Sequence, residues 1–296
     1  MKKSKKDLLK WYDEEYCLQA VKQDGEVLQF IKNPTEEMYL IAIKQNGDNL
    51  QFIKNQTEEI CLKAIKQNSW SLRFVQNQTE KICLEAVKQN QETIQYVHNQ
   101  TEKICLEAVK QNGHMILYIR NPTEKICLEA VKQNGEALKH IYNQTEKICL
   151  AAIKQNWRAL QYVKNSNYIN FPTEEMYLIA IKQDPWILPC IKNPTEKIYL
   201  EAIKQDKRVI QYIKNPTKKM CLIAVKQDGL TLLYIKNQTE GICLEAVKQN
   251  GLALKYVHDP TEKVCLEALN QNIEAIKYID IKRFPKVYEK YLFMIK

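Results

Sequence analysis

The sequence predicts an all-α protein, an α-solenoid of about twelve 22-residue helix–turn–helix repeats with a capping helix at each end. Three observations predict this fold class. A threonine, usually followed by an acidic residue, recurs at a constant spacing. Each repeat contains an apolar stripe too wide for a helix that is covered on one side only. Glycine is scarce, with 7 in 296 residues, and proline recurs at fixed repeat positions.

The threonine spacing sets the limits of the repeat array. It is 22 residues in one block and again in a second block, and an insertion of six residues near 166–171 separates the two. Asp13 takes the threonine position in a first, degenerate repeat, and Lys218 replaces the usual acidic residue in one later repeat. The array is therefore predicted to span residues 13–282, with its threonines at Thr35, Thr57, Thr79, Thr101, Thr123, Thr145, Thr173, Thr195, Thr217, Thr239 and Thr261.

The first half of each repeat has the features of an α-helix start. In the repeat of Thr123, we expect Asn121 to be the N-cap, Pro122 the first helical residue and Glu124 the third, as in a capping box. The apolar residues of segment 126–131 cover more than half of the helix circumference, as expected for a helix packed between neighbours. Asn134-Gly135 is predicted to end this helix in a left-handed turn.

The second half of each repeat predicts a shorter helix. Its apolar positions are those of Leu138, His140 and Ile141. In most repeats an aromatic residue takes the place of His140, and we expect these rings to lie on the core side with Leu and Ile. The aromatic residues are Phe30, Phe52, Phe74, Tyr96, Tyr118, Tyr162, Tyr212, Tyr234, Tyr256 and Tyr278.

The two ends predict capping elements. Residues 1–12 are interpreted as a basic arm with a capping helix. Residues 283–296 are predicted to form a C-terminal capping helix that starts near Pro285. Its apolar residues follow helical spacing and comprise Val287, Tyr288, Tyr291, Leu292 and Ile295.

The repeat also resembles a known family. The pattern L-E-A-V-K-Q-N-G-x-A-L-K-Y is similar to the repeat of the family called domain of unknown function 4116, over roughly residues 11–280. The resemblance implies helical repeats and an origin in a giant DNA virus or in a bacterium that lives in amoebae. It implies no activity and no functional residues.

Composition indicates a cytoplasmic location. No apolar run approaches the ~20 residues that a membrane span needs, and no secretory signal is recognisable near Met1. Ten cysteines without such a signal favour a reducing compartment. The net charge of +9 comes mainly from Lys, which is weak evidence for nucleic-acid recognition because bidentate phosphate contacts favour Arg.

The cysteines and histidines do not predict a catalytic or metal site. Nine cysteines occupy one repeat position, with rungs ~8–10 Å apart, and Cys190 alone lies elsewhere. We expect small buried hydrophobes at these rungs. His98, His114, His140 and His258 fall at three different repeat positions. The sequence therefore predicts no enzyme, no cofactor and no metal. Lys81 and Glu85 are expected to form a weak pair within one helix, as are their equivalents in other repeats.

Two rows of basic residues support a second hypothesis, a nucleic-acid-binding solenoid. One row is the repeated Lys-Gln-Asn/Asp triplet, and the other contains Lys32, Lys54, Arg120, Lys164, Lys192, Lys214 and Lys236. Solenoids that bind RNA also present stacking groups to the strand. Since the repeated rings are expected in the core, this hypothesis ranks second.

The first hypothesis is a non-enzymatic protein-binding scaffold, a viral or intracellular-parasite factor that engages host proteins. Residues that vary between repeats are free to bind, and variation concentrates where the second helix begins. Three consecutive repeats carry Trp, Arg and Lys there, next to the insertion, and Trp and Arg are frequent interface anchors. The alternative is that these rings fill space left by the insertion. The predicted partner-binding residues are Trp157, Arg158, Tyr168, Phe171, Trp186, Lys207 and Arg208.

Overall fold

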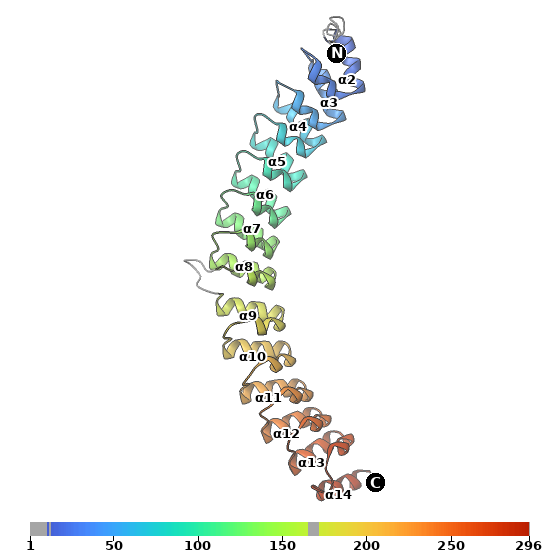
Figure 1. Cartoon of the computed structure of the whole chain (residues 1–296), viewed down its shortest axis with the longest axis vertical. Helices are drawn as coiled ribbons and strands as arrows, with labels where there is room; N and C mark the ends of the chain where they lie inside the picture. Colours follow the sequence, from blue (N-terminus) through green and yellow to red (C-terminus); the bar gives the residue numbers. More distant parts are fainter. Residues whose placement is uncertain (1–10, 12, 165–171, 296) are drawn as a thin grey trace, which may run out of the picture. The chain divides into compact units, whose positions relative to one another are not determined.

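The computed structural model describes residue 11 and residues 13–164 and 172–295. The chain divides into two compact units, Met1–Asn170 and Phe171–Lys296. Each unit is an alternating series of α-helices and six-residue 3-10 helices, which are labelled η (Figure 1).

In the first unit, seven pairs of helices follow one another within the described residues. Each α-helix has ten residues and each 3-10 helix has six. Their bounds are α2 (Glu14–Gln23), η2 (Gly25–Phe30), α3 (Glu36–Gln45), η3 (Gly47–Phe52), α4 (Glu58–Gln67), η4 (Ser69–Phe74), α5 (Glu80–Gln89), η5 (Gln91–Tyr96), α6 (Glu102–Gln111), η6 (Gly113–Tyr118), α7 (Glu124–Gln133), η7 (Gly135–His140), α8 (Glu146–Gln155) and η8 (Trp157–Tyr162).

The second unit repeats the pattern and adds a terminal helix. Its described elements are α9 (Glu174–Gln183), η9 (Pro185–Cys190), α10 (Glu196–Gln205), η10 (Lys207–Tyr212), α11 (Lys218–Gln227), η11 (Gly229–Tyr234), α12 (Glu240–Gln249), η12 (Gly251–Tyr256), α13 (Glu262–Gln271), η13 (Ile273–Tyr278) and α14 (Pro285–Met294). The described residues contain no strand, so the predicted all-α repeat solenoid is confirmed.

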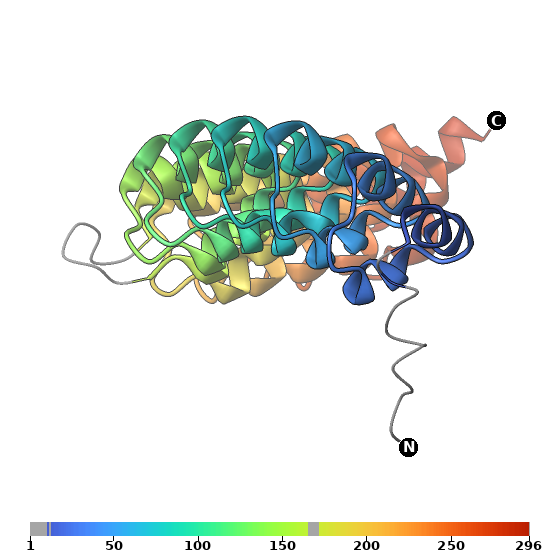
Figure 2. The ribbon, with the colours of Figure 1, turned by 90° about the horizontal axis from the view of Figure 1, so that it is seen from above.

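Packing within each unit joins like elements. Each α-helix contacts the next α-helix, and each 3-10 helix contacts the next 3-10 helix. Figure 2 shows the resulting two rows of helices in the first unit. The core lies between the rows, where Ile126, Ala130 and Val131 of α7 meet Leu138 and Ile141 of the same repeat, all at most 2% exposed.

The α-helices start two residues later than predicted. Thr123, not Asn121, is the N-cap of α7, and its hydroxyl accepts a hydrogen bond from the backbone N–H of Ile126 at 3.4 Å. Asn121 is exposed and lies outside the helix. Both Asn121 and Thr123 are residue types that can cap a helix. Thr123 also donates a hydrogen bond from its hydroxyl to Glu102 of the preceding repeat.

The turn after each α-helix also differs from the prediction. Asn134 is extended (φ −148°), and none of the described glycines has a positive φ. Asn134 instead caps η7, because its side-chain oxygen accepts from the backbone N–H of Glu136 at 3.0 Å. Gly135 is needed for close approach. A Cβ there would lie 2.5 Å from the carbonyl oxygen of Ala152 in the next α-helix.

This approach allows a side-chain bridge between repeats. The Oε1 atom of Gln155 accepts a hydrogen bond from Gly135 N at 2.6 Å. The equivalent bridge forms at each glycine that begins a 3-10 helix, reaching from Gln45, Gln67, Gln133, Gln249 and Gln271. The Gln of these Lys-Gln-Asn/Asp triplets, and Gln271 of Asn-Gln-Asn in the last repeat, therefore tie the stack together, and the Asn or Asp that follows caps a 3-10 helix.

A second glutamine ties the linkers wherever the sequence reads Asn-Gln-Thr. The side-chain amide of Gln144 donates to the carbonyls of Leu138 and Tyr162 at 3.1 and 3.0 Å and accepts from Lys164 N at 2.9 Å. Such a residue joins the linkers of two successive repeats. The others are Gln56, Gln78, Gln100 and Gln238.

The charged residues of the α-helices pair between repeats. Lys81 binds Glu58 of the preceding α-helix at 2.8 Å, and the hydroxyl of Thr79 donates to the same carboxylate at 3.2 Å. The predicted pair of Lys81 with Glu85 is therefore wrong. The Lys81 hydrogen bond lowers the pKa of Glu58. The same pairing recurs at Glu80–Lys103, Glu102–Lys125, Glu124–Lys147 and Glu174–Lys197.

The nine cysteines of the ladder are buried, as predicted, whereas Cys190 is exposed. Burial raises the pKa of the Cys61 and Cys105 thiols to about 11. His114 and His140 form an edge-on ring pair with centroids 5.9 Å apart. No three His, Cys, Asp or Glu residues of the described chain are grouped as metal ligands.

The last helix, α14, packs against the second unit through one of its faces and leaves the other exposed. Val287 of α14 is fully buried, whereas Leu292 and Ile295 are exposed. Among the residues that the structure describes, no helix is both long and apolar enough to cross a membrane.

Candidate interaction surface

The repeated aromatic rings lie at the surface of the 3-10 helices, which corrects the prediction that they are core residues. Phe30 is 50% exposed and Tyr212 is 48% exposed. A 3-10 helix has three residues per turn. In η3 the core takes the third and fourth residues and the following Ile53, which leaves the fifth and sixth residues facing outward.

We define the 3-10 face as the second, fifth and sixth residues of each 3-10 helix. Its second position contacts the sixth position of the next repeat. Trp70 and Tyr96 make this contact in the first unit with ring centroids 5.8 Å apart, and Trp186 and Tyr212 make it in the second at 5.9 Å. The face is therefore continuous from one repeat to the next.

Trp186, Arg208 and Tyr212 form one cluster in the second unit. The guanidinium of Arg208 lies over the Trp186 ring, 5.1 Å from its centroid, while Tyr212 meets the same ring edge-on. Two predicted site residues, Trp186 and Arg208, are thus in contact. Trp186 remains 38% exposed, so one side of the cluster is open to a partner.

Acidic residues hold both cations of this region. Arg208 binds Asp206, the N-cap of η10, through Nε at 3.0 Å and Nη2 at 2.6 Å. This bidentate hydrogen bond lowers the pKa of Asp206 and fixes the guanidinium plane against the indole. Lys207 lies 3.8 Å from Asp228, the N-cap of the next 3-10 helix. Lys207 therefore links two repeats.

The open surface continues onto η11 through two leucines. Leu230 is 40% exposed and Leu233 is 54% exposed. They are three residues apart, so they lie on the same side of a 3-10 helix. We call Trp186, Tyr212, Leu230 and Leu233 the apolar patch. Five sister repeats carry Glu or Asp in place of Trp186 and Leu230, and five carry Gln in place of Leu233.

A row of lysines follows the linkers beside this patch. Lys192, Lys214 and Lys236 occupy the second position after each 3-10 helix and are exposed. None of the three forms an ion pair within the described residues. In the first unit, burial lowers the pKa of His140, and Lys139, His114 and finally Lys164 of this row lie close enough to lower it further. The row therefore runs beside the sixth position of the preceding repeat.

The remaining predicted site residues lie elsewhere. Trp157 and Arg158 belong to the first unit, where the guanidinium lies over the indole ring at 4.7 Å. Trp157 is half-buried and Arg158 is exposed. Tyr168 and Phe171 lie outside the described residues. The structure thus joins Trp157 with Arg158 in one unit and Trp186 with Arg208 in the other.

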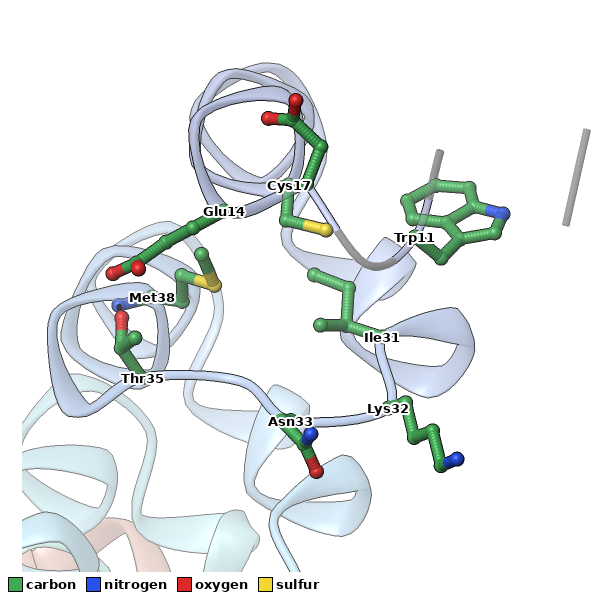
Figure 3. A pocket seen from close by; sticks show the side chains of 9 residues that line it. Trp11, Glu14, Cys17, Ile31, Lys32, Asn33, Thr35 and Met38 are labelled. Atoms are coloured by element: carbon green, nitrogen blue, oxygen red, sulfur yellow. Dashed lines mark hydrogen bonds between the residues drawn. The ribbon is translucent and has the colours of Figure 1, made fainter. Parts of the chain in front are cut away.

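Two small hollows occur at equivalent repeat positions of the two units. Figure 3 shows the one in the first unit, where the Cys17 thiol points between Ile31 and Met38 and the Lys32 side chain points away. The other is lined by Cys243 and His258, among other residues. Each opens between the start of an α-helix and the following linker, beside the cysteine ladder.

Sequence reasoning missed Tyr212, Leu230 and Leu233. The leucines could have been found by aligning the fifth as well as the second position of every 3-10 helix, where Gln is replaced by Leu117 and Leu233. Tyr212 could not be found from the sequence. An aromatic residue recurs at its position in most repeats, and such a recurring ring predicts a core position.

Comparison with known proteins identifies the family. The model of the family described as "Domain of unknown function (DUF4116)" matches residues 35–78, 79–122, 123–167, 217–260 and 239–284. The chain belongs to this family. The five matches each cover about two repeats of the present structure. No curated protein and no solved structure matches the chain.

Proposed function

We propose that this DUF4116 protein is a non-enzymatic scaffold that binds a protein partner through the 3-10 face of its second unit. The observation that carries the proposal is the apolar patch. Trp186, Leu230 and Leu233 are well exposed at positions where sister repeats carry acidic or amide side chains. The stack does not require apolar residues there, whereas contact with another protein rewards them.

The cluster around Trp186 supports this assignment. Asp206 holds Arg208, and Arg208 and Tyr212 hold the indole from two sides. A ring that is fixed before binding loses little conformational freedom on contact, so it is suited to anchor a partner. Trp157 and Arg158 are proposed as a second, smaller anchor on the first unit. The proposed host partner and cytoplasmic location rest on the family resemblance and on composition.

Affinity capture with matched variants tests the proposal. The full chain and the double variant Trp186→Glu/Leu233→Gln are immobilised and exposed to nuclease-treated extract at two salt concentrations. Both substitutions introduce residues that sister repeats carry, so the thermal unfolding midpoint should stay within a few degrees. We expect the double variant to capture at least about tenfold less of a specifically bound protein than the parent chain does.

Leu117→Gln is the control, because Leu117 is 56% exposed at the same repeat position in the first unit. This control should capture the partner as well as the parent does. Equal capture by the double variant would refute the proposal. Loss of folding in the variant would indicate that the rings are packing elements.

A nucleic-acid partner is the second candidate, and one observation favours it. The aromatic row is half-exposed and runs beside Lys192, Lys214 and Lys236, as a stacking platform for single strands would require. Gln and Asn of the triplets are engaged within the stack, so the Lys and aromatic residues would carry the binding. Fluorescence anisotropy with a single-stranded oligonucleotide tests this candidate. Strong, salt-dependent binding that Lys214→Gln abolishes would support it.

A further inference from the structure

The 3-10 faces of the two units differ in charge. In the first unit, the second position is acidic in four repeats, with Glu26, Asp48, Glu92 and Glu136. From η9 to η12 in the second unit, the second, fifth and sixth positions include no Asp or Glu at all. They include two cations, Arg208 and Lys255. This part of the second unit is therefore apolar and positive, whereas acidic residues slightly outnumber Arg73, Lys139 and Arg158 at the same positions of the first unit.

The linker lysines add to that positive charge. Lys192, Lys214 and Lys236 recur in three successive repeats, and Lys218 takes the place of an acidic residue between them. The nearby carboxylates of Asp206 and Asp228 are bound by Arg208 and Lys207. None of the three lysines forms an ion pair within the described residues. Lys236 lines the same hollow as Glu240 and Asp259, but these carboxylates bind Thr261 and Arg283.

We propose that the apolar patch and its lysine row bind an acidic amphipathic segment of a partner protein. Apolar side chains of the segment lie on Trp186, Tyr212, Leu230 and Leu233, and its carboxylates face Lys192, Lys214 and Lys236. This inference rests on the proposed protein-binding function and specifies the chemistry of the partner. Opposite charges at the rim speed association and select among partners.

The leucines favour such a segment over a nucleic acid. Bases bind single-strand platforms by stacking on planar side chains. Leu230 and Leu233 offer no planar surface, yet they are among the exposed apolar residues of the patch. Aliphatic side chains bordered by lysines match a polypeptide with apolar and acidic faces.

The size of the patch sets the length of the segment. It extends over three repeats, and the three lysines lie in the linkers that follow the same three 3-10 helices. Stacked repeats are ~8–10 Å apart, so the surface is about 25–30 Å long. A helix that covers this length has about 16–20 residues at 1.5 Å per residue.

A random 20-residue peptide library displayed on phage provides the probe. The full chain serves as bait at physiological salt. We expect enriched peptides to carry a net negative charge and to repeat apolar residues at helical spacing. Their affinity for the bait and its variants is then measured by fluorescence polarisation with synthetic copies.

Two variants and two matched controls locate the site. Leu233→Gln should weaken the selected peptides at least about tenfold. The double variant Lys214→Gln/Lys236→Gln should weaken them by a similar factor at low salt and by less at high salt, because salt screens exposed charges. Leu117→Gln and Lys54→Gln make the same changes on the first unit and should alter affinity less than about twofold. Circular dichroism confirms that each variant is folded.

The outcomes separate this inference from the function on which it rests. Enriched peptides that need Leu233 but carry no acidic bias would overturn the acidic partner and leave the binding face in place. Failure to enrich any peptide, or peptides that bind the Leu233→Gln variant equally, would overturn both. An oligonucleotide that displaces the peptides and depends on Lys214 but not on Leu233 would assign the surface to nucleic acid instead.

Discussion

The two units share one backbone design but differ in what ties their repeats and in what they present to solvent. The linkers of the first unit contain Gln56, Gln78, Gln100 and Gln144, whereas the second unit has Gln238 alone and Pro at its other linkers. The Glu–Lys pairs between α-helices likewise number four in the first unit and two in the second, Glu174–Lys197 and Glu245–Lys226, among the described residues. The first unit therefore uses more polar side chains to join its own repeats.

The difference shows that the repeat fixes only its buried positions. Positions that contact the next repeat must satisfy backbone groups or close gaps, and they change within narrow limits. The second and fifth positions of each 3-10 helix vary more widely, although the second position does touch the next repeat where Trp186 meets Tyr212. The second position is acidic in four repeats of the first unit and is Trp186, Leu230 or Leu252 in three repeats of the second, which is why we assign binding to the second unit.

The largest expected effect concerns glycine in the stack. Gly229→Ala in the second unit should cost about 2 kcal/mol, because the added Cβ overlaps the Ala246 carbonyl oxygen and the bridge from Gln249 is lost. Gly135→Ala in the first unit should cost the same. Chemical denaturation measures both. Gly241→Ala is the control, since nothing lies within 4 Å of its added Cβ, and it should stabilise α12 by about 0.5–1 kcal/mol.

A somewhat smaller effect is expected at the linker glutamines. Gln144 is fully buried, and Gln144→Ala leaves the Tyr162 carbonyl and the Lys164 N–H without their bonds. The free energy of unfolding should fall by about 1–2 kcal/mol. The exposed Gln161→Ala should change it by less than about 0.5 kcal/mol. If the two variants are equally stable, the linker glutamines do not hold the first unit together.

The cysteine ladder should not distinguish the units. Cys105→Ala in the first unit and Cys243→Ala in the second should each cost about 1 kcal/mol, because both thiols are buried. Neither change should alter metal content or partner binding. Stoichiometric zinc that disappears with either substitution would contradict a purely structural ladder.

Acid should weaken the first unit slightly more than the second. The Lys hydrogen bonds lower the pKa of Glu58, Glu80 and Glu102, and Thr195 with Lys197 does the same for Glu174. A carboxyl with a lowered folded pKa stabilises the fold fully above its ordinary value of 4.5, and that contribution is lost as pH falls below it.

The unfolding midpoint should therefore drop between pH 6 and pH 3.5. It should drop less in a variant with Lys81, Lys103 and Lys125 changed to Gln. A change of Lys197 alone to Gln should have a smaller effect. An identical drop in all variants would show that these exposed pairs do not contribute.

Sequence alone predicted the fold because every repeat has the same buried positions. Leu, Ala and Thr columns at a constant spacing define where helices begin, pack and end. The N-cap was placed two residues early, since Asn121 and Thr123 can both cap and only the contact with the preceding repeat favours Thr123. Gly135 was assigned to a left-handed turn, because the next α-helix that forbids a side chain there is not visible in one repeat.

The candidate surface could be predicted only in part. Unusual residues at one variable column correctly pointed to Trp186 and Arg208 as neighbours. The aromatic row is predicted in the core because its rings share the apolar pattern of the second helix with Leu and Ile. With three rather than 3.6 residues per turn, the sixth residue turns outward. Whether the ring at the sixth position is exposed depends on the type of helix, and the apolar pattern of only six residues does not determine that type.

The glycine and glutamine ties have a consequence for local motion. The repeat of η10 begins with Lys207 instead of Gly, continues to Pro216 instead of Gln and reaches Lys218 instead of Glu. Three bonds that join neighbouring repeats elsewhere are therefore missing here, whereas the Lys207–Asp228 pair and the hydrogen bond from Gln227 to the Ile203 carbonyl remain. We expect amide hydrogens of η10 and α11 to exchange with solvent sooner than those of α7 and η7. A surface on such a compliant segment can adjust its curvature to a partner, and bound protein would slow the exchange there first.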